Sequence, residues 1–576
     1  MEELVSKVGK AKYRILCADD LICYRLRSIG LPSDLVDYSE DFDVWHISHR
    51  LVKQWKSILK SCPSSTYLGV NALEFSSDSF AFMLKVRALC ADLAKAGYEV
   101  AFIILNKYFN RKFPTLNASS IVTVCYGPRL RELRAFLGIL RRHCHRSGRI
   151  TRSADISFGV RSKSCARGLC LIGASTTRSG DLTDYYLRPA VSILTECHSV
   201  GIRFKCVVDM FVMGQLLHKH GLDYEIVSGP KLRELPRFLF DVMLRFIRLR
   251  KFLVRAACRD DSLRLTLPLV LQGMFSNYYT GLIQINFFES LITSLSPKIL
   301  LAIPDRGRTG RIGVEVARRH HVPSLTVQAG LIDEHPENGI LIADKVAVMG
   351  QQARRIYLRK GVDPSRVVVT GMAHWDSIFR RHKQQDHEEL RRHGIDTKKR
   401  IVVFATENIP FAETSRMIEG TISEILKWDQ TVLAIKIHPR EDTDIYRKMT
   451  ETYPPDKVVA TRDIDLYSLL SSCEVLVNGF SNVTLEAMMI GKPVVSINLS
   501  GKPDKFPFEE FKAALVVRRY EDIPPAIATL LSKEKTLAEL DQGRRNCVTE
   551  YAHLADGKAS YRIAVLIAAS MGQHKI

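Results

Sequence analysis

The residues best suited to chemistry form a short segment at the end of a predicted strand. Residues 432–438 are mostly apolar and read as a buried strand. The segment that closes this strand consists of Lys436, Ile437, His438, Pro439, Arg440 and Glu441. Proline stiffens the turn, so His438 is held in one direction beside cationic side chains. Its imidazole can donate a hydrogen bond to a phosphate oxygen as a nucleotide leaves; the alternative is a histidine that only caps the turn.

A second segment suited to anion binding follows a predicted strand at residues 474–478. Its candidate nucleotide-binding residues are Gly479, Ser481, Asn482, Thr484 and Glu486. Ser481 stands where a helix should begin, and backbone N–H groups, the helix dipole and nearby hydroxyls together form an anion site. Glu486 can reach a ribose hydroxyl or cap the loop. An ordinary serine N-cap is the alternative interpretation.

The elements around these segments follow the pattern of parallel α/β sheets. Short β-branched runs alternate with amphipathic helical stretches along most of the chain. We predict an α/β fold of two Rossmann-like lobes with an additional N-terminal α/β region. The expected domains are residues 1–160 for the accessory region, 165–378 for the first lobe and 379–576 for the second lobe with its C-terminal helices. A ligand cleft should lie between the lobes, at the carboxyl ends of the strands.

The two chemical segments together resemble the nucleotide-binding lobe of GT-B glycosyltransferases that build bacterial capsules and lipooligosaccharides. The Lys-x-His-Pro-Arg-Glu element is most similar to that of sialyltransferases and Kdo transferases, which use CMP-activated sugars. Residues 346–376 resemble the interlobe segment shared with polyol-phosphate transferases and hydrolysing UDP-N-acetylglucosamine 2-epimerases. The resemblance covers about residues 295–500. It implies that the first lobe binds the acceptor and the second lobe binds the nucleotide sugar.

Differences between this sequence and the motifs of these families rank the families by their similarity to the chain. The epimerases resemble the chain less, because only Glu486 remains of their paired acidic residues after Ser-Gly-Gly. Retaining transferases of the sucrose-synthase type carry a second Glu where Asn478 stands, and polyol-phosphate transferases usually have an Asp just before their Ser pair. Relatives often have Gln-His-Gly where this chain has Gln328-Ala329-Gly330. The resemblance therefore implies an inverting, metal-independent transferase, with a CMP-activated nonulosonic acid or Kdo as a possible donor.

An inverting transfer needs a base that takes the proton of the acceptor hydroxyl. The resemblance implies an Asp or Glu of the first lobe in this role. Asp181 and Asp184 lie in the loop after the first strand of that lobe, and Asp305 follows a later strand. We expect one of these three carboxylates to act together with His438. Asp305 has arginines as neighbours and could instead form an ion pair.

Composition narrows the partners and the compartment. The chain has 83 basic and 62 acidic residues, a net charge of +21, which attracts polyanions such as nucleic acid, anionic lipid or sugar phosphates. The sequence shows no nucleic-acid-binding motif, no pattern of metal ligands and no signal peptide. We therefore expect a cytoplasmic enzyme that uses a nucleotide sugar and a glycan or lipid-linked glycan acceptor, without metal or other cofactor and without specific nucleic acid.

Residues 235–259 raise a separate possibility. Apolar residues recur there at near-helical spacing among many arginines. Such a helix can lie on the anionic inner face of a membrane, where lipid-linked acceptors reside; the alternative is a helix packed on the sheet with its arginines in water. For the whole chain, the alternative functions are a transferase of CDP-linked polyol phosphate and a non-catalytic scaffold for polysaccharide assembly.

Overall fold

The computed structural model describes most of the chain after residue 167 and isolated elements before it. The described residues are 13–17, 33–35, parts of 50–71, 100–104, 121–124 and 168–572, the last without 173–183, 209–210, 231–233, 259–266, 268–273, 335–337, 382–386, 408–410, 440, 480, 500–503 and 505. The chain divides into two compact units. One contains residues 1–164 and 228–294, and the other contains residues 165–227 and 295–576.

This division differs from the predicted boundaries, which place residues 228–294 in the first lobe. The described part of that segment forms two long helices, α9 (Leu235–Ala257) and α11 (Met274–Leu295). It contributes no strand to the sheet of the first lobe, as far as its residues are described. The segment is therefore an insertion between two βα units of that lobe.

The unit that contains the N-terminus has its own parallel sheet. Its strands are β1 (Tyr13–Cys17), β2 (Ser33–Leu35), β5 (Val100–Ile104) and β6 (Ile121–Val124), in the order β2-β1-β5-β6. The three neighbouring pairs are all parallel. A separate antiparallel pair joins β3 (Thr66–Tyr67) and β4 (Val70–Asn71). These strands agree with the predicted N-terminal α/β region.

The first lobe of the larger unit is built on a seven-stranded parallel sheet of order β13-β12-β11-β10-β7-β8-β9. Its strands are β7 (Gly168–Ile172), β8 (Phe204–Val208), β9 (Tyr224–Ile226), β10 (Ile299–Ile303), β11 (Ser324–Val327), β12 (Lys345–Val348) and β13 (Val367–Val369). The helices between them are α7 (Asp184–Ser199), α8 (Phe211–Lys219), α12 (Arg308–Arg319) and α13 (Gln351–Arg359). The strand order reverses between β7 and β10, where an open α/β sheet usually binds its ligand.

The second lobe repeats this plan with a six-stranded parallel sheet of order β16-β15-β14-β17-β18-β19. Its strands are β14 (Arg400–Ala405), β15 (Thr431–Lys436), β16 (Val458–Thr461), β17 (Val475–Asn478), β18 (Val494–Ile497) and β19 (Leu515–Val517). The strand order reverses between β14 and β17. Because β14 pairs with both β15 and β17, it separates the two predicted nucleotide-binding segments.

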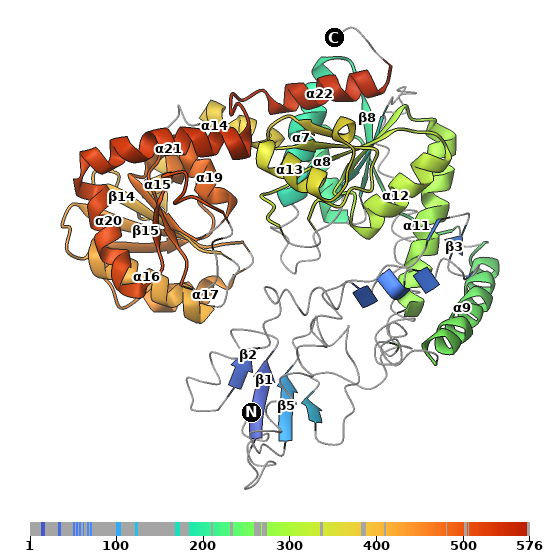
Figure 1. Cartoon of the computed structure of the whole chain (residues 1–576), viewed down its shortest axis with the longest axis horizontal. Coiled ribbons are helices and arrows are strands. Elements are labelled where there is room, and N and C mark those ends of the chain that lie inside the picture. The colour runs from blue at the N-terminus through green and yellow to red at the C-terminus, as the bar shows by residue number, and fades with distance from the viewer. Residues whose placement is uncertain are drawn as a thin grey trace. The chain divides into compact units, whose positions relative to one another are not determined.

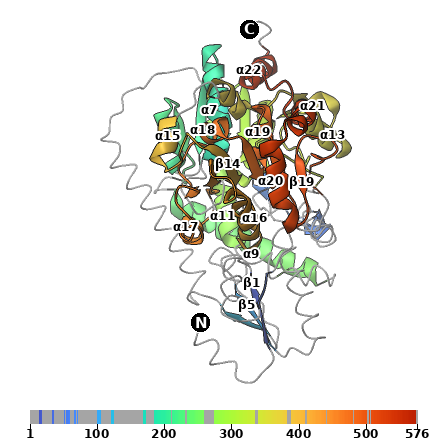
Figure 2. The ribbon, with the colours of Figure 1, turned by 90° about the vertical axis from the view of Figure 1, so that its left-hand side faces the viewer.

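Alternating side chains bury both faces of this sheet. Val402 and Phe404 of β14 belong to one apolar core, which α16 (Phe411–Ile425) and α20 (Ile523–Ser532) cover (Figure 2). Val403 and Ala405 belong to the opposite core. The helices of that second core are α15 (His387–Arg392), α18 (Leu466–Ser472), α19 (Asn482–Met489) and α21 (Glu534–Ala552). Burial on both faces explains why the strands are almost entirely apolar.

The last helix of the chain returns to the first lobe. Helix α22 (Ala559–Ser570) packs against α7 and against the short 3-10 helix η4 (Ala373–Trp375), and Ile563 and Ile567 are buried in the first lobe's core (Figure 1). The predicted boundaries assign this helix to the second lobe. The apolar face of α22 instead completes the packing of α7, so the chain crosses between the lobes twice.

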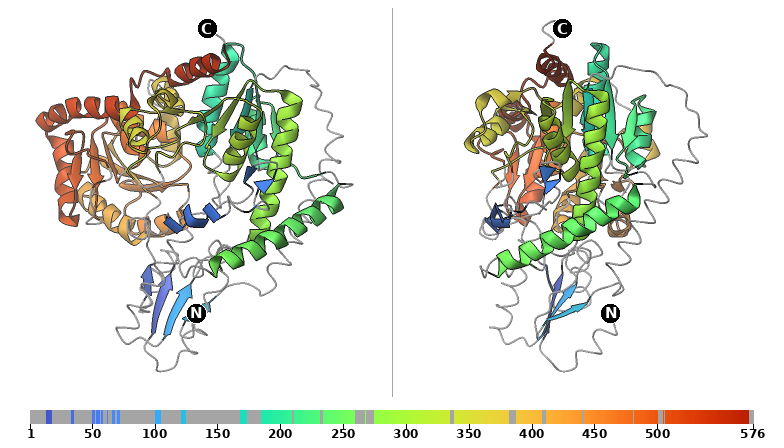
Figure 3. Two further views of the ribbon diagram at one scale, coloured as in Figure 1. Left: turned by 45° about the vertical axis from the view of Figure 1, so that its right-hand side comes forward. Right: turned by 90° about the vertical axis from the view of Figure 1, so that its right-hand side faces the viewer.

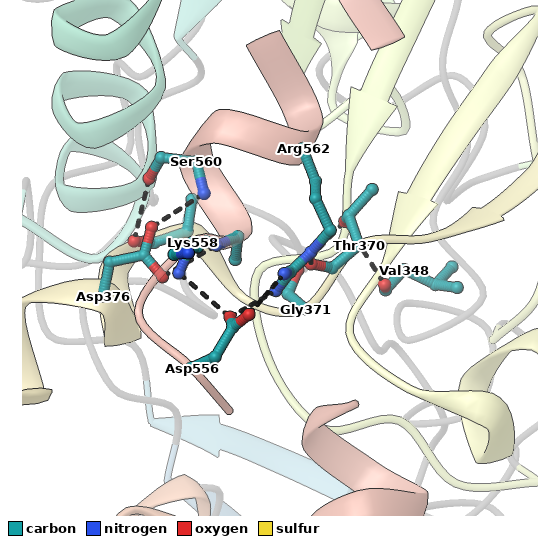
Figure 4. A network of polar contacts seen from close by, with 10 residues as sticks. Val348, Thr370, Gly371, Asp376, Asp556, Lys558, Ser560 and Arg562 are labelled. Carbon is teal, nitrogen blue, oxygen red and sulfur yellow. Dashed lines mark hydrogen bonds and ion pairs between the residues drawn. The ribbon is translucent and has the colours of Figure 1, made fainter. Parts of the chain in front are cut away.

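A polar network fixes this second crossing (Figure 4). The carboxylate of Asp376 accepts hydrogen bonds from the backbone N–H groups of Ala559 and Ser560, at 3.0 and 2.7 Å, at the start of α22. Arg562 donates to the carbonyl of Thr370 at 2.7 Å and pairs with Asp556. Asp376 thus supplies the cap that a helix start needs. Among the described residues, no helix is long and apolar enough to cross a membrane.

Candidate functional site

A network of hydrogen bonds holds the backbone at the strand end that carries His438. The backbone N–H of His438 donates to Thr406 Oγ1 at 2.7 Å, and the hydroxyl of Thr406 donates to the carboxylate of Glu441. Tyr446 also donates to Glu441, at 2.6 Å. Glu441 therefore shapes the turn, and its predicted role in nucleotide binding stays a prediction. Pro439 and the half-buried imidazole of His438 lie on this turn, and Arg440 lies outside the described residues.

Lys436 is the cation of this segment whose surroundings are described. Its ammonium group donates to the backbone carbonyl of Arg462. Burial lowers the pKa of Lys436 to about 8, and the charge of Asp463 opposes this shift while that of Arg188 adds to it. At neutral pH the side chain still carries its proton in most molecules. Lys436 can therefore supply positive charge to an anion at the carboxyl edge of the sheet.

The loop between β17 and α19 is organised by Asn478. Its fully buried side chain donates to the carbonyl of Ala405 at 2.6 Å and accepts from the hydroxyls of Ser481 and Thr484, at 3.0 and 2.8 Å. Thr484 is itself fully buried and its hydroxyl shapes the loop, and its predicted contact with a nucleotide stays a prediction. Ser481 is the N-cap residue of α19, but its side chain makes no capping hydrogen bond. The ordinary serine-cap interpretation is therefore wrong for this helix.

Gly479 marks a close approach within the same loop. A Cβ atom at this position would lie 2.9 Å from a carboxylate oxygen of Glu407, the residue that follows Thr406 after β14. Glu407 thus lies between the two nucleotide-binding segments. The sequence analysis missed it, although an acidic residue directly after a buried central strand is a usable signal.

Two contacts bring α19 of the second lobe to the first lobe and to the interlobe segment. The side chain of Asn482 accepts a hydrogen bond from the backbone N–H of Leu331 at 2.9 Å. Leu331 directly follows the segment Gln328-Ala329-Gly330. In this segment the side-chain amide of Gln328 donates a hydrogen bond to the carbonyl of Gly330 and accepts one from the backbone N–H of Met349. Asn482 therefore connects the two lobes, and its predicted contact with a nucleotide stays a prediction.

The second contact is made by Glu486. Its carboxylate accepts a hydrogen bond from the indole N–H of Trp375 at 2.7 Å and lies 4.0 Å from Nε2 of His374. All three side chains are buried, and His374 Nδ1 has no hydrogen-bond partner among the described residues. The sequence analysis missed His374 and Trp375, because they stand more than a hundred residues before Glu486 and carry no motif of their own.

Burial shifts both titratable groups of this cluster. It raises the pKa of Glu486 to about 7, and the Trp375 hydrogen bond and the charge of Arg188 oppose this shift. It lowers the pKa of His374 to about 3, and the charge of Arg188 lowers it further. His374 is therefore neutral at physiological pH, whereas Glu486 is only partly ionised. Paired groups with such shifted pKa values are typical of functional sites.

Arg188 contributes a cation from the first lobe. It lies on α7, which packs against η4, and its charge acts on His374, Lys436 and Glu486. Its side chain is exposed. The site thus combines positive charge from both lobes with donors at the two strand ends. Such an arrangement can bind a phosphorylated ligand.

The three candidate bases have different outcomes. Asp305 is only 4% exposed and accepts hydrogen bonds from the backbone N–H groups of Ile342 and Ala343, at 2.8 and 2.9 Å. Burial raises its pKa, and these two hydrogen bonds oppose the shift. We therefore interpret Asp305 as a residue that fixes the loop before β12. Asp184 begins α7 but its side chain is outside the described residues, as is all of Asp181, so both stay predictions.

The chain is similar to known proteins in sequence and in fold. A family model described as UDP-N-acetylglucosamine 2-epimerase matches residues 276–568. Among curated proteins, none matches the sequence. Within the described part of the chain, no group of His, Cys, Asp and Glu could hold a metal ion.

Solved structures with a similar fold have low identity to this chain. A Staphylococcus aureus MnaA–UDP co-structure is 14% identical, with coverage of 70% of this chain and 97% of that chain and a TM-score of 0.48. The UDP-GlcNAc 2-epimerase from Neisseria meningitidis bound to UDP-GlcNAc is 12% identical, with coverage of 69% and 99% and a TM-score of 0.48. A glycosyltransferase from Rickettsia africae is 11% identical, with coverage of 71% and 99% and a TM-score of 0.46.

The family match corrects the ranking of relatives made from the sequence. The matched range contains both nucleotide-binding segments, and its family is the one that the sequence analysis placed below the sialyltransferases and Kdo transferases. That ranking was wrong; it rested on the His-Pro turn and on the incomplete pair of acidic residues at Glu486. The comparisons give no support to a CMP-activated nonulosonic acid or Kdo as the donor.

Proposed function

Because this chain belongs to the UDP-N-acetylglucosamine 2-epimerase family, we propose that it binds a UDP-linked N-acetylhexosamine between its two lobes and catalyses the departure of UDP. The observation that supports this most is the placement of two donor-rich strand ends on either side of β14, next to the point between β14 and β17 where the strand order reverses. Ligands of open α/β sheets bind at such points.

The roles of individual residues follow from the geometry. Lys436 and the imidazole of His438 would donate to the diphosphate, and the backbone N–H groups at the start of α19 would add to this site. Arg188 would contribute charge from the first lobe. These donors favour the departing UDP because its negative charge increases as the bond to the sugar breaks.

The proposed outcome of this cleavage is inversion at C2 of the sugar. Inversion at that carbon requires a base that removes the C2 proton as the C1–O bond to UDP breaks, which leaves a C1–C2 double bond. An acid then returns a proton to the opposite face of C2 while UDP adds back to C1, so the product is the epimeric UDP-sugar. Glu486, with a pKa of about 7, has the protonation behaviour that such chemistry needs near neutral pH. Its hydrogen bond to Trp375 holds the carboxylate in the interlobe segment.

A second candidate is inverting transfer of the sugar to a surface-glycan acceptor. It is favoured by the incomplete acidic pair, because only Glu486 remains of the paired acidic residues that the sequence analysis attributes to the epimerases. Transfer needs only one base, which would be Asp181 or Asp184 of the first lobe. In both candidates UDP departs from the sugar. They differ in the group that loses a proton, which is the attacking acceptor hydroxyl in transfer and C2 of the sugar in epimerisation.

Two measurements test the proposal. Calorimetry with UDP, CDP, CMP and GDP should show a preference for UDP; preference for CDP would support a polyol-phosphate transferase, and no binding a scaffold. The chain is then incubated with UDP-N-acetylglucosamine in D₂O and followed by NMR. Deuterium at C2 and a second UDP-sugar are expected for epimerisation. UDP release that requires a glycan acceptor, without deuterium at C2, would overturn epimerisation in favour of transfer.

A further inference from the structure

Helix α9 has two apolar faces. One face carries Leu235, Val242, Leu249, Leu253 and Ala257, which are buried. This face packs within its own unit, where the ring of Phe238 meets Tyr279 of α11 edge-on, with centroids 5.8 Å apart. The helix appears as one continuous rod in both views of Figure 3. The alternative interpretation from the sequence, a packed helix with its arginines in water, therefore describes only half of α9.

The other face is apolar and exposed. Phe240 is 67% exposed, and Met243, Leu244, Ile247 and Val254 are between 36% and 44% exposed. These positions recur at the spacing i, i+3, i+4, i+7 and i+14, which places them in one stripe along the helix. Five of the ten exposed large apolar side chains among the described residues thus lie on this one helix. A continuous apolar stripe of this kind indicates an interaction surface.

Cations border this stripe. The exposed basic residues of α9 are Arg237, Arg248, Arg250, Lys251 and Arg255. At about 100° of rotation per residue, Arg237, Arg248 and Arg255 fall along one edge of the stripe, Arg250 along the other and Lys251 within it. The single acid of the helix, Asp241, is paired with Arg245 at 2.9 Å. The exposed face therefore combines apolar side chains with an excess of positive charge.

We propose that this face of α9 binds the surface of an anionic lipid bilayer, with the helix lying parallel to it. The apolar stripe would enter the boundary between headgroups and acyl chains, while the bordering arginines reach lipid phosphates. Charge selects this occupant over a second copy of the chain. Two α9 faces in contact would bring ten cations together, and like charges disfavour such an interface.

The experiment is flotation of the full chain with two kinds of vesicle, phosphatidylcholine alone and phosphatidylcholine with phosphatidylglycerol. We expect recovery only with the second kind. The variant Phe240→Ser/Ile247→Ser keeps every charge and should lower the partition coefficient about tenfold or more. Leu426→Ser, at another exposed apolar position of similar accessibility, is the matched control and should bind as the unchanged chain does.

A second pair of variants separates the local cations from the overall positive charge. Arg248→Gln/Lys251→Gln/Arg255→Gln should weaken binding by about fivefold for each cation removed. The control Lys448→Gln/Lys533→Gln/Lys535→Gln removes the same charge from exposed positions elsewhere and should change recovery little. Far-UV circular dichroism confirms that each variant is folded.

Three results would overturn the proposal. The first is no recovery with either kind of vesicle. The second is equal loss in both charge variants, which would assign binding to the net charge of the chain. The third is a dimer, seen by analytical ultracentrifugation without lipid, that dissociates in the Phe240→Ser/Ile247→Ser variant; that result would assign the stripe to self-association.

Discussion

The two lobes of the larger unit use their strand ends differently. In the second lobe, the segments after β15 and β17 present Lys436, His438 and the start of α19 at the carboxyl edge of the sheet. In the first lobe, Asp305 after β10 is bound by two backbone N–H groups and is buried. We propose that the same architecture serves a ligand in the second lobe, whereas in the first lobe it fixes a loop.

The pKa values of Glu486 and Asp305 can be compared directly, because both side chains are buried carboxylates, one in each lobe. Burial raises the pKa of both groups. Asp305 accepts hydrogen bonds from two backbone N–H groups, whereas Glu486 has the side chains of Trp375 and Tyr467 as donors. At Glu486 the effect of burial outweighs these donors, so its pKa of about 7 lets the carboxylate change protonation state near neutral pH.

The largest expected effect is a loss of turnover from a change in the second lobe that leaves the stability of the fold unchanged. His438→Ala should lower turnover by about 100- to 1000-fold, because a donor to the departing diphosphate is lost. The melting temperature should change little, since the turn is held by the backbone N–H of His438 and by Glu441. Steady-state kinetics and calorimetric melting measure the two quantities. His220→Ala, at an exposed position on the first lobe, is the control; a collapse in stability for His438→Ala would show a structural role.

The converse change in the first lobe should affect stability and leave binding intact. Asp305→Ala leaves the buried N–H groups of Ile342 and Ala343 without their acceptor, at a cost of about 2–4 kcal/mol of unfolding free energy. Denaturant unfolding measures the loss, and calorimetry with UDP on the folded variant should give an unchanged affinity. Asp444→Asn, an exposed residue, is the control. An inactive but fully stable Asp305→Ala variant would restore Asp305 as a candidate base.

The next effect concerns pH. Burial raises the pKa of Glu486 in the folded state from its ordinary value of 4.5 to about 7, so the protonated form is favoured by folding. Its contribution to stability is fully present below pH 4.5 and is lost as the pH rises to about 7. Glu486→Gln should remove a decline of up to about 3 kcal/mol over this window. Unfolding curves of both proteins at several pH values test this, and parallel pH profiles would contradict it.

The smallest effect concerns the link between the lobes. Asn482→Ala removes the acceptor for the backbone N–H of Leu331 and should cost about 1 kcal/mol. Because that contact joins the start of α19 to the first lobe, UDP affinity should fall several-fold along with stability. Asn338→Ala, which breaks a hydrogen bond within the first lobe, is the control. Unchanged UDP affinity would show that the lobes bind the nucleotide independently.

The sequence predicts the sheets well because buried parallel strands are nearly continuous apolar runs, and β14, β15 and β17 all show this pattern. It also locates the two strand ends that carry Lys436, His438 and Ser481. It cannot predict the partners of these residues. The contact between Trp375 and Glu486 joins residues 111 positions apart, and neither carries a local signal for the other.

Long-range packing explains the remaining differences. Thr484 and Glu441 have the residue types of ligand-binding groups, but the fold directs both towards other protein groups. The amphipathic pattern of α9 cannot show which face is packed, because both faces are apolar. The assignment of α22 to its own lobe failed because adjacency in the chain does not require adjacency in the core.

The return of α22 has a mechanical consequence. Two separate covalent links, near residues 370–400 and 552–559, connect the lobes, so any rotation must bend both at once. Such a double link disfavours twisting that a single tether would allow. Hydrogen bonds join the two links to each other. Asp376 of the first link accepts from the start of α22, and Arg562 of α22 donates to the carbonyl of Thr370. Relative motion of the lobes would therefore follow a reproducible path, returning Arg188 to the same position opposite the second lobe each time.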